Sequence, residues 1–242
     1  MKALQGKVAI ITGASSGFGL GTAYRFAQAG CDLVITARNE EKLKQVAVQC
    51  EHWGNRTVYL AGDARDEQTA HAVVALAIER FKKIDILINN AGIGKLLPIE
   101  KTSMADFDTI MDTNVRSTFS FTKYTVPEMK KQHAGQIILT SSVTGIKGHA
   151  DETAYTCSKF ALRGLGQALD QELLKDGIRT CVFCPHAGAT NFEVGHGRTK
   201  AEVAASGFLT PDDVAEALLA VCTQPSHSRI VELRLASNNV NY

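Results

Sequence analysis

The amino-acid sequence predicts an α/β fold: a single doubly wound domain of residues 1–242 with helices on both faces of a seven-stranded parallel sheet. Short runs rich in Val, Ile and Leu alternate with longer segments whose apolar residues recur at helical spacing. Most of these runs are continuously apolar, as in parallel strands buried on both faces. The strand–helix alternation implies right-handed crossovers, and we find no repeat, low-complexity segment or linker that would divide the chain.

The expected elements follow one another along the whole chain. Strands are expected at Val8–Thr12, Asp32–Thr36, Thr57–Ala61, Ile84–Asn89, Gly135–Ser141, Arg179–Phe183 and Arg229–Leu235. Helices are expected at Gly17–Ala29, Glu40–His52, Glu67–Lys82, Met104–Gln132, Glu152–Lys175 and Pro211–Thr223. The pair Asp176-Gly177 suits a left-handed stop after a helix, and Pro211 suits the first turn of the last helix.

The composition argues against several classes of protein. The chain has 242 residues, and 45% of them are hydrophobic, which is enough to fill a large core. Its 26 Lys and Arg balance 25 Asp and Glu without a long run of either sign, so we expect no nucleic-acid partner. No apolar stretch approaches the roughly 18 residues of a membrane span, and no signal peptide is evident. We therefore expect a soluble, cytoplasmic protein without a membrane partner.

The six cysteines do not indicate a metal site or a disulfide framework. Cys181 and Cys184 have a metal-like spacing, but they lie in an apolar strand pattern without a second pair nearby. Positions three apart in a strand point to opposite faces, so one metal ion would not easily bind both. We expect buried, reduced thiols here and at Cys31 and Cys50, and we expect Cys157 to point away from its neighbour Tyr155.

A glycine-rich turn follows the first expected strand and leads directly into a helix. The turn reads Gly13-Ala14-Ser15-Ser16-Gly17-Phe18-Gly19. In such an arrangement, backbone N–H groups can approach an anion, and the amino terminus of the helix adds a partial positive charge. The order of elements predicts a phosphate cradle. The glycine spacing differs from the common G-x-G-x-x-G dinucleotide pattern.

Tyr155 and Lys159 lie four residues apart in a helical pattern, so they share a helix face. A positive charge beside a phenol favours the phenolate and lowers its pKa from the usual value near 10, which suits a general acid or base. Ser142 follows an apolar run, at the end of a strand where α/β sheets bind ligands, and its hydroxyl can bind a carbonyl oxygen. Alone, the Tyr-x3-Lys pattern is also typical of a surface pair on an amphipathic helix.

Taken together, these motifs resemble those of the short-chain dehydrogenase/reductase family, over roughly residues 5–192 and a final strand. The matching motifs are Thr12-Gly13-x3-Gly17-x-Gly19, Asn89-Asn90-Ala91-Gly92, the set Asn114, Ser142, Tyr155 and Lys159, and the segment Pro185–Thr190. The resemblance implies a Rossmann-type fold. The chain departs from the family pattern in two places: His186 replaces a glycine, and an Asp-Gly-Gly ending is absent.

The resemblance also implies roles for individual residues. Tyr155 would exchange a proton with the substrate oxygen, Lys159 would bind the ribose hydroxyls, and Ser142 would position the oxygen. Asn114 would hold a water that links Lys159 to solvent. The implied cofactor-binding residues are Gly13, Ser15, Ser16, Gly17, Phe18, Gly19, Arg38, Asp63, Ala64, Asn90, Ala91, Gly92, Tyr155, Lys159, Gly188 and Thr190.

Within this set, Asp63 would bond the adenine, and Thr190 and Gly188 would contact the nicotinamide carboxamide. The pair Asn89-Asn90 is also a common turn signal. His186 is interpreted as a turn residue or a wall of the pocket, with a catalytic base as the alternative.

The end of the second strand decides the expected cofactor. An acidic residue there would bond a ribose 2′-hydroxyl, whereas an arginine accommodates a 2′-phosphate. This chain has Ala37 at the position of the acidic residue, followed by Arg38, whose guanidinium can bind a phosphate through two hydrogen bonds. We predict NADP(H) in preference to NAD(H), although Arg38 at a strand end is also consistent with a solvated surface charge.

The substrate is the least determined part of the prediction. By resemblance, a loop at about residues 190–210 encloses it, and this segment carries Gly195, His196, Gly197, Arg198 and Lys200. The two cations would suit an anionic substrate, but a solvated, mobile lid fits the same composition. Apolar flanks at Ile93, Leu96, Leu97, Val143 and Phe192 are compatible with many small ketones.

The sequence therefore predicts an oxidoreductase that transfers a hydride between NADP(H) and a small carbonyl or secondary-alcohol substrate, without a metal ion. Two alternatives stay open. A sugar-nucleotide epimerase or dehydratase also uses Tyr-x3-Lys, although with another glycine spacing and a larger carboxyl-terminal region. A catalytically silent cofactor-sensing protein is expected to lack Tyr155 or Lys159.

Two helical segments carry more apolar residues than one core-facing stripe needs. They are Phe107, Ile110, Met111, Val115, Phe119 and Val126 in the first, and Phe160, Leu162, Leu165, Leu169 and Leu173 in the second. An additional apolar face usually marks a partner surface, and in the family the corresponding helices form a two-fold interface. We expect a homodimer or homotetramer, with deeper burial of these residues as the alternative.

Overall fold

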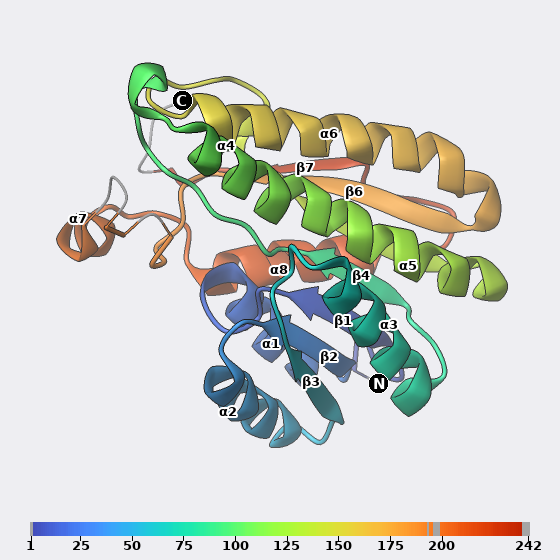
Figure 1. Cartoon of the computed structure of the whole chain (residues 1–242). Helices are drawn as coiled ribbons and strands as arrows, with labels where there is room; N and C mark the ends of the chain where they lie inside the picture. The colour runs from blue at the N-terminus through green and yellow to red at the C-terminus, as the bar shows by residue number, and fades with distance from the viewer. Residues whose placement is uncertain (1, 193, 196–198, 239–242) are drawn as a thin grey trace.

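The computed structural model describes residues 2–192, 194–195 and 199–238. Its strands form one parallel sheet in the order β3-β2-β1-β4-β5-β6-β7 (Figure 1). The strands are β1 (Val8–Thr12), β2 (Asp32–Ala37), β3 (Thr57–Ala61), β4 (Ile86–Asn89), β5 (Gly135–Thr140), β6 (Ile178–Pro185) and β7 (Glu232–Leu235). The chain builds outward from β1 to β3 and then returns to β4 beside β1. The predicted seven-stranded, doubly wound fold is confirmed, and the switch between β1 and β4 is where such sheets bind ligands.

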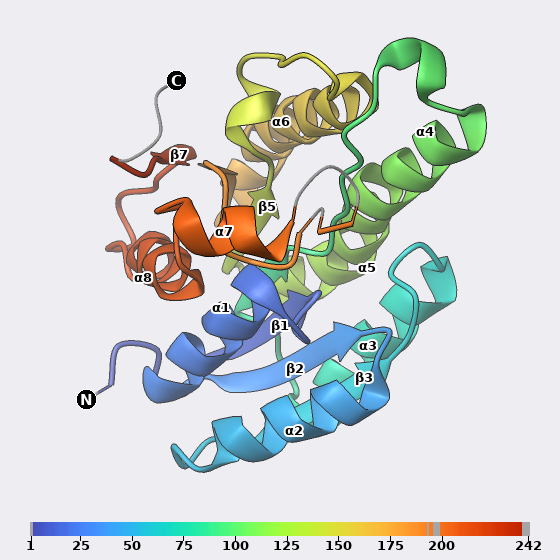
Figure 2. The same cartoon turned by 90° about the vertical axis from the view of Figure 1, so that its left-hand side faces the viewer.

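Helices cover both faces of this sheet (Figure 2). They are α1 (Gly17–Gln28), α2 (Glu40–Glu51), α3 (Glu67–Phe81), α4 (Met104–Met111), α5 (Ser117–Gln132), α6 (Thr153–Leu173), α7 (Lys200–Ala205) and α8 (Pro211–Cys222). Residues of α1, α2 and α8 pack in one core cluster, and residues of α3, α5 and α6 pack in another. Successive side chains of a strand point to opposite faces, so the neighbours Ile10 and Ile11 of β1 lie in different clusters.

Polar residues fix where several helices begin. Asn39, Asp66 and Ser103 each accept a hydrogen bond from a backbone N–H in the first turn of the following helix. Thr210 forms a reciprocal capping box before Pro211, which occupies the predicted first position of α8. Gly177 adopts φ 73°, the left-handed stop expected after α6. Among the described residues, no helix has both the length and the hydropathy that crossing a bilayer requires.

The structure corrects the predicted helix Met104–Gln132, which is not one continuous α-helix. The π-helical segment η2 (Asp112–Arg116) separates α4 from α5. It carries Asn114, whose side chain is held by the loop after β4. A single π turn shifts the register of a helix only locally. The helical spacing of the apolar residues before and after it therefore does not reveal it.

Most other boundaries differ from the prediction by one or two residues, and two differences are larger. The helix α7 lies within the segment expected to be a loop, where Thr199 and Glu202 form a capping box. Strand β7 begins at Glu232 and not at Arg229, whose guanidinium instead binds both oxygens of Asp170 on α6 at 2.8 and 3.0 Å.

Candidate active site

The glycine-rich turn lies between β1 and the amino terminus of α1. A Cβ at Gly19 would lie 2.4 Å from the carbonyl oxygen of Gly13 and 2.5 Å from Nδ2 of Asn90, so only glycine fits there. Gly17 has φ 55°, a conformation that favours glycine. Ser16 precedes α1, and its side chain does not cap the helix. The first N–H groups of α1 therefore remain available for an anion, as a phosphate cradle requires.

Thr12, the last residue of β1, joins this turn to the segment after β4. Its Oγ1 accepts hydrogen bonds from the backbone N–H groups of Asn90 and Ala91, both at 2.9 Å. In return, Nδ2 of Asn90 donates to the Thr12 carbonyl at 3.0 Å. The structure thus brings two groups of predicted cofactor-binding residues together at the switch point of the sheet.

Asn114 links the loop after β4 to helix α6. Its Oδ1 accepts from the Ile93 N–H at 2.8 Å, and its Nδ2 donates to the Ile93 carbonyl and to Ser158 Oγ, both at 2.9 Å. A Cβ at Gly92 would lie 3.2 Å from Asn114 Oδ1 and 3.6 Å from Lys159 Nζ. The chain around Gly92 therefore passes close to two predicted catalytic residues.

Tyr155 and Lys159 lie side by side on α6, and both are buried. Lys159 Nζ lies 5.3 Å from the centre of the Tyr155 ring and donates a hydrogen bond to the Thr140 carbonyl, at the end of β5, at 2.8 Å. Ser141 Oγ donates to the Lys159 carbonyl at 2.8 Å, which fixes α6 against the same strand end. Ser142 lies just after the strand, where its Oγ accepts from the Thr144 N–H at 3.1 Å.

The segment after β6 contacts both the glycine-rich turn and α6. A Cβ at Gly17 would lie 3.4 Å from Cγ2 of Thr190, and a Cβ at Gly188 would lie 2.3 Å from Cζ of Phe18. The Phe192 ring packs against the Tyr155 ring, with their centres 5.7 Å apart. The segment that carries the predicted nicotinamide-binding residues thus touches both the glycine-rich turn and Tyr155.

At the other end of the predicted cofactor site, Arg38 is exposed directly after β2 and Asp63 follows β3. Asp63 accepts hydrogen bonds from the Arg65 guanidinium at 2.7 to 3.1 Å. These bonds, and more weakly the Arg38 charge, hold the pKa of the Asp63 carboxyl below its usual value. Asp63 could therefore bond an adenine only in competition with Arg65, a partner that the sequence did not indicate.

Residues 7–200 match the family model described as short chain dehydrogenase. The chain belongs to this family. An uncharacterized oxidoreductase of Thermotoga maritima is 40% identical over 197 residues, which span 81% of this chain and 77% of that protein. The predicted family is confirmed, and with it an oxidoreductase activity.

Solved structures agree with this assignment. An alcohol dehydrogenase from the archaeon Thermococcus sibiricus, complexed with 5-hydroxy-NADP, superimposes with a TM-score of 0.89 at 27% identity and covers 98% of both chains. A metagenomic short-chain oxidoreductase in complex with NADP has a TM-score of 0.84 at 29% identity, over 96% of this chain and 97% of the other. These matches do not favour the epimerase or the cofactor-sensing alternative.

In this short-chain dehydrogenase, His186 extends the strand instead of starting a turn. It follows Pro185, the last residue of β6, and its backbone N–H donates to the Leu235 carbonyl of β7 at 2.8 Å. The two strands therefore stay paired as far as this position, and the side chain is partly buried.

The expected substrate loop is only partly described. Its His196, Gly197 and Arg198 lie outside the described residues, and Lys200 is exposed at the start of α7. A pocket of about 460 Å³ lies against this helix. It is lined by Ala189, Asn191, Lys200, Val203, Ala204, Gly207, Phe208 and Thr210.

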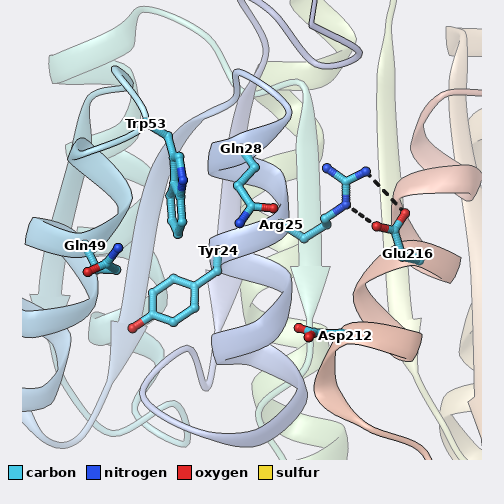
Figure 3. A pocket seen from close by; sticks show the side chains of 7 residues that line it. All are labelled: Tyr24, Arg25, Gln28, Gln49, Trp53, Asp212 and Glu216. Atoms are coloured by element: carbon cyan, nitrogen blue, oxygen red, sulfur yellow. Dashed lines mark hydrogen bonds and ion pairs between the residues drawn. The ribbon is translucent and has the colours of Figure 1, made fainter.

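A second pocket, of about 590 Å³, contains none of the predicted site residues (Figure 3). It is lined by Tyr24, Arg25, Gln28, Gln49, Trp53, Asp212 and Glu216. The Tyr24 and Trp53 rings meet edge to face with their centres 5.7 Å apart, and Arg25 pairs with Glu216 across the pocket. These contacts join α1 to α8 and to the turn after α2, so we assign this hollow to helix packing.

The cysteines are all free thiols. Cys31, Cys50, Cys181 and Cys184 are buried, and Cys157 is exposed. Burial raises the pKa of the Cys181 thiol to about 12, so it is a neutral packing group near pH 7. Within the described part of the chain, no group of His, Cys, Asp and Glu side chains is arranged to hold a metal ion.

Three residues that support the site were not among the predicted ones. They are Thr12, which binds the Asn90 segment; Thr140, whose carbonyl binds Lys159; and Ser158, which binds Asn114. Thr12 and Thr140 are the last residues of their strands, and Ser158 lies between Tyr155 and Lys159. Thr12 and Thr140 could have been found from the sequence, because each is a polar residue at the carboxyl end of a buried strand.

Proposed function

We propose that this dehydrogenase transfers a hydride between NADP(H) and a small ketone, aldehyde or secondary alcohol. The observation that carries the proposal is the Tyr155–Lys159 pair on α6, which Lys159 ties to the end of β5, the strand that Ser142 follows. The NADP ligands of the two similar solved structures support the choice of cofactor. When bound, NADP(H) supplies or accepts the hydride.

In the proposed mechanism, Tyr155 donates its hydroxyl proton to the carbonyl oxygen during reduction and removes it again during oxidation. Ser142 hydrogen-bonds the same oxygen and stabilises the charge that develops there. Lys159, fixed by Thr140 and next to the ring, would bind the ribose hydroxyls of the cofactor, and its positive charge would favour the deprotonated phenol. Asn114 holds the Gly92–Ile93 backbone beside Lys159. Its water link to solvent remains a prediction.

The direct test measures oxidation of NADPH and of NADH against a panel of small aldehydes and ketones. We expect turnover with NADPH for part of the panel and lower kcat/KM values with NADH. Tight NADPH binding without turnover on any carbonyl would instead support the sensing alternative. Release of a rearranged sugar nucleotide without net NADPH consumption would support the epimerase alternative.

Arg38 is proposed to set the coenzyme preference. Replacing Ala37 with Asp and Arg38 with Gln should weaken NADPH binding and favour NADH, because it exchanges a guanidinium for a carboxylate beside the 2′ position. The ratio of kcat/KM for NADPH over NADH should fall at least about tenfold, the value of one charged hydrogen bond. Lys42→Gln, which removes one positive charge from the exposed face of α2, is the control for the loss of the Arg38 charge. An unchanged ratio would contradict the role of Arg38.

We further propose a homodimer or homotetramer built from α4, α5 and α6. Ile110, Leu162 and Leu173 of the predicted apolar surplus are buried in the core, but Phe119 is 56% exposed and Phe160 is 43% exposed. Sedimentation equilibrium at micromolar concentration should give a multiple of 26.1 kDa. Phe119→Glu should shift the mass toward one chain, because it places a charge in the interface. Val48→Glu, at an exposed apolar residue of α2, should not. A monomeric wild-type protein would contradict the proposal.

Two remaining proposals concern organisation and location. We propose that residues 1–242 form one domain that holds both the cofactor and the substrate, with a substrate loop at about 190–210; the single sheet that includes every strand supports this. We also propose a cytoplasmic location, which the free thiols of all six cysteines support, because reducing compartments preserve them.

A further inference from the structure

Glu152, the residue before helix α6, does not use its carboxylate as a helix cap. The residue at this position usually carries a short polar side chain that accepts hydrogen bonds from the first N–H groups of the helix. The Glu152 side chain makes no such bond to α6. Its Oε2 instead accepts a hydrogen bond from Thr144 Oγ1 at 3.0 Å, so the carboxylate is turned toward the segment after β5.

This contact places a negative charge next to the predicted catalytic residues. The same Thr144 donates its backbone N–H to Ser142 Oγ at 3.1 Å, so one residue connects Glu152 with Ser142. Glu152 lies three residues before Tyr155, directly before the first residue of α6. Thr144 and Ser142 are buried and Glu152 is half-buried, so solvent screens this charge only in part.

The charge is not neutralised within the described part of the chain, whose ion pairs do not include Glu152. The loop after β4 covers this edge of the site: the Leu97 N–H donates to the Asp151 carbonyl at 2.7 Å, and the loop passes beside the start of α6 (Figure 1). The Glu152 carboxylate is thus separated from Ser142 by one residue, Thr144, beside the loop that covers the start of α6.

We propose that Glu152 makes the enzyme selective for carbonyl substrates that carry a protonated amine; this inference rests on the proposed function. A carboxylate only accepts hydrogen bonds, so its best partner is a cationic donor. Such a donor on the far side of a small ring from the carbonyl would bind Glu152 while Ser142 and Tyr155 hold the oxygen. An anionic substrate, which the cations of the substrate loop would suit, is repelled at this position.

The test uses matched pairs of cyclic ketones with NADPH and the full-length protein. N-methyl-4-piperidone is largely protonated near neutral pH, and 4-methylcyclohexanone is its uncharged counterpart of similar shape. The wild-type enzyme should have the higher kcat/KM for the cationic ketone. In Glu152→Gln, the ratio of the two kcat/KM values should fall about ten- to hundredfold, mainly through KM, because a charged hydrogen bond becomes a neutral one. The glutamine oxygen still accepts from Thr144, so Ser142 keeps its support.

Asp151→Asn is the matched control. Asp151 is the neighbouring exposed carboxylate and has φ 60°, which asparagine adopts readily. The Asp151→Asn substitution removes the same negative charge one residue away from Glu152. It should leave the ratio of the two kcat/KM values within twofold of the wild-type ratio. An equal loss of activity on both ketones in Glu152→Gln would show that Glu152 only supports Ser142, and it would overturn the inference. An unchanged ratio of the two kcat/KM values in Glu152→Gln would also overturn the inference, and so would a wild-type enzyme that prefers the neutral ketone. The proposed function would stand in both cases. Absence of turnover on every carbonyl would contradict both.

Discussion

Tyr155→Phe is expected to lower kcat by about 10²–10⁴-fold while the protein still folds and binds NADPH. The substitution removes only the hydroxyl that would exchange a proton with the substrate. The ring stays in place because its packing against Phe192 and its burial on α6 are apolar contacts. Steady-state kinetics at saturating ketone measures the loss, and quenching of NADPH fluorescence measures binding.

Tyr24→Phe provides the control for this experiment. It makes the same chemical change on α1, in a pocket without any predicted catalytic residue, and should leave kcat within twofold. If Tyr155→Phe also keeps kcat within twofold of wild type, Tyr155 is not the proton donor.

Gly19→Ala is expected to damage both the cofactor site and the fold. The added Cβ would meet the Gly13 carbonyl, which is backbone, and the Asn90 side chain, which cannot move without breaking its hydrogen bond to the Thr12 carbonyl. Overpacking of this kind costs about 1–3 kcal/mol of unfolding free energy. The Kd for NADPH should rise about tenfold if roughly 1.4 kcal/mol of that cost falls on the cradle. Urea denaturation and NADPH titration measure the two effects.

Gly164→Ala on α6 is the comparison for that variant. Its Cβ would have no atom within 4 Å, and alanine stabilises an exposed helix position by roughly 0.5–1 kcal/mol over glycine. The two alanine substitutions should therefore have opposite effects on stability. Unchanged NADPH affinity in Gly19→Ala would mean that the turn does not bind the cofactor.

The sheet and most of the helices could be predicted because their signals are local. A buried parallel strand needs a continuous apolar run, and the cap residues that start α3, α4 and α8 are visible as single letters. The π-helical segment was not predictable in this way. It depends on a contact between Asn114 and Ile93, residues that only the folded chain brings together.

The site shows the same division. The i, i+4 spacing correctly placed Tyr155 beside Lys159, since a helix fixes that geometry alone. The pairing of Asp63 with Arg65 and of Glu152 with Thr144 could not be anticipated. In both cases a carboxylate had several possible partners, and the loop conformation, not the spacing, decides which one it reaches.

The segment Gly188–Phe192 has a consequence for the order in which ligands bind. It contacts the glycine-rich turn through Gly188 and Thr190 and the Tyr155 ring through Phe192. A coenzyme seated in the turn would press on one end of this segment, and a substrate on the other end. Coenzyme binding should therefore prepare the substrate site and raise its affinity for the substrate. Because such coupling is reciprocal at equilibrium, a bound substrate must tighten coenzyme binding by the same factor.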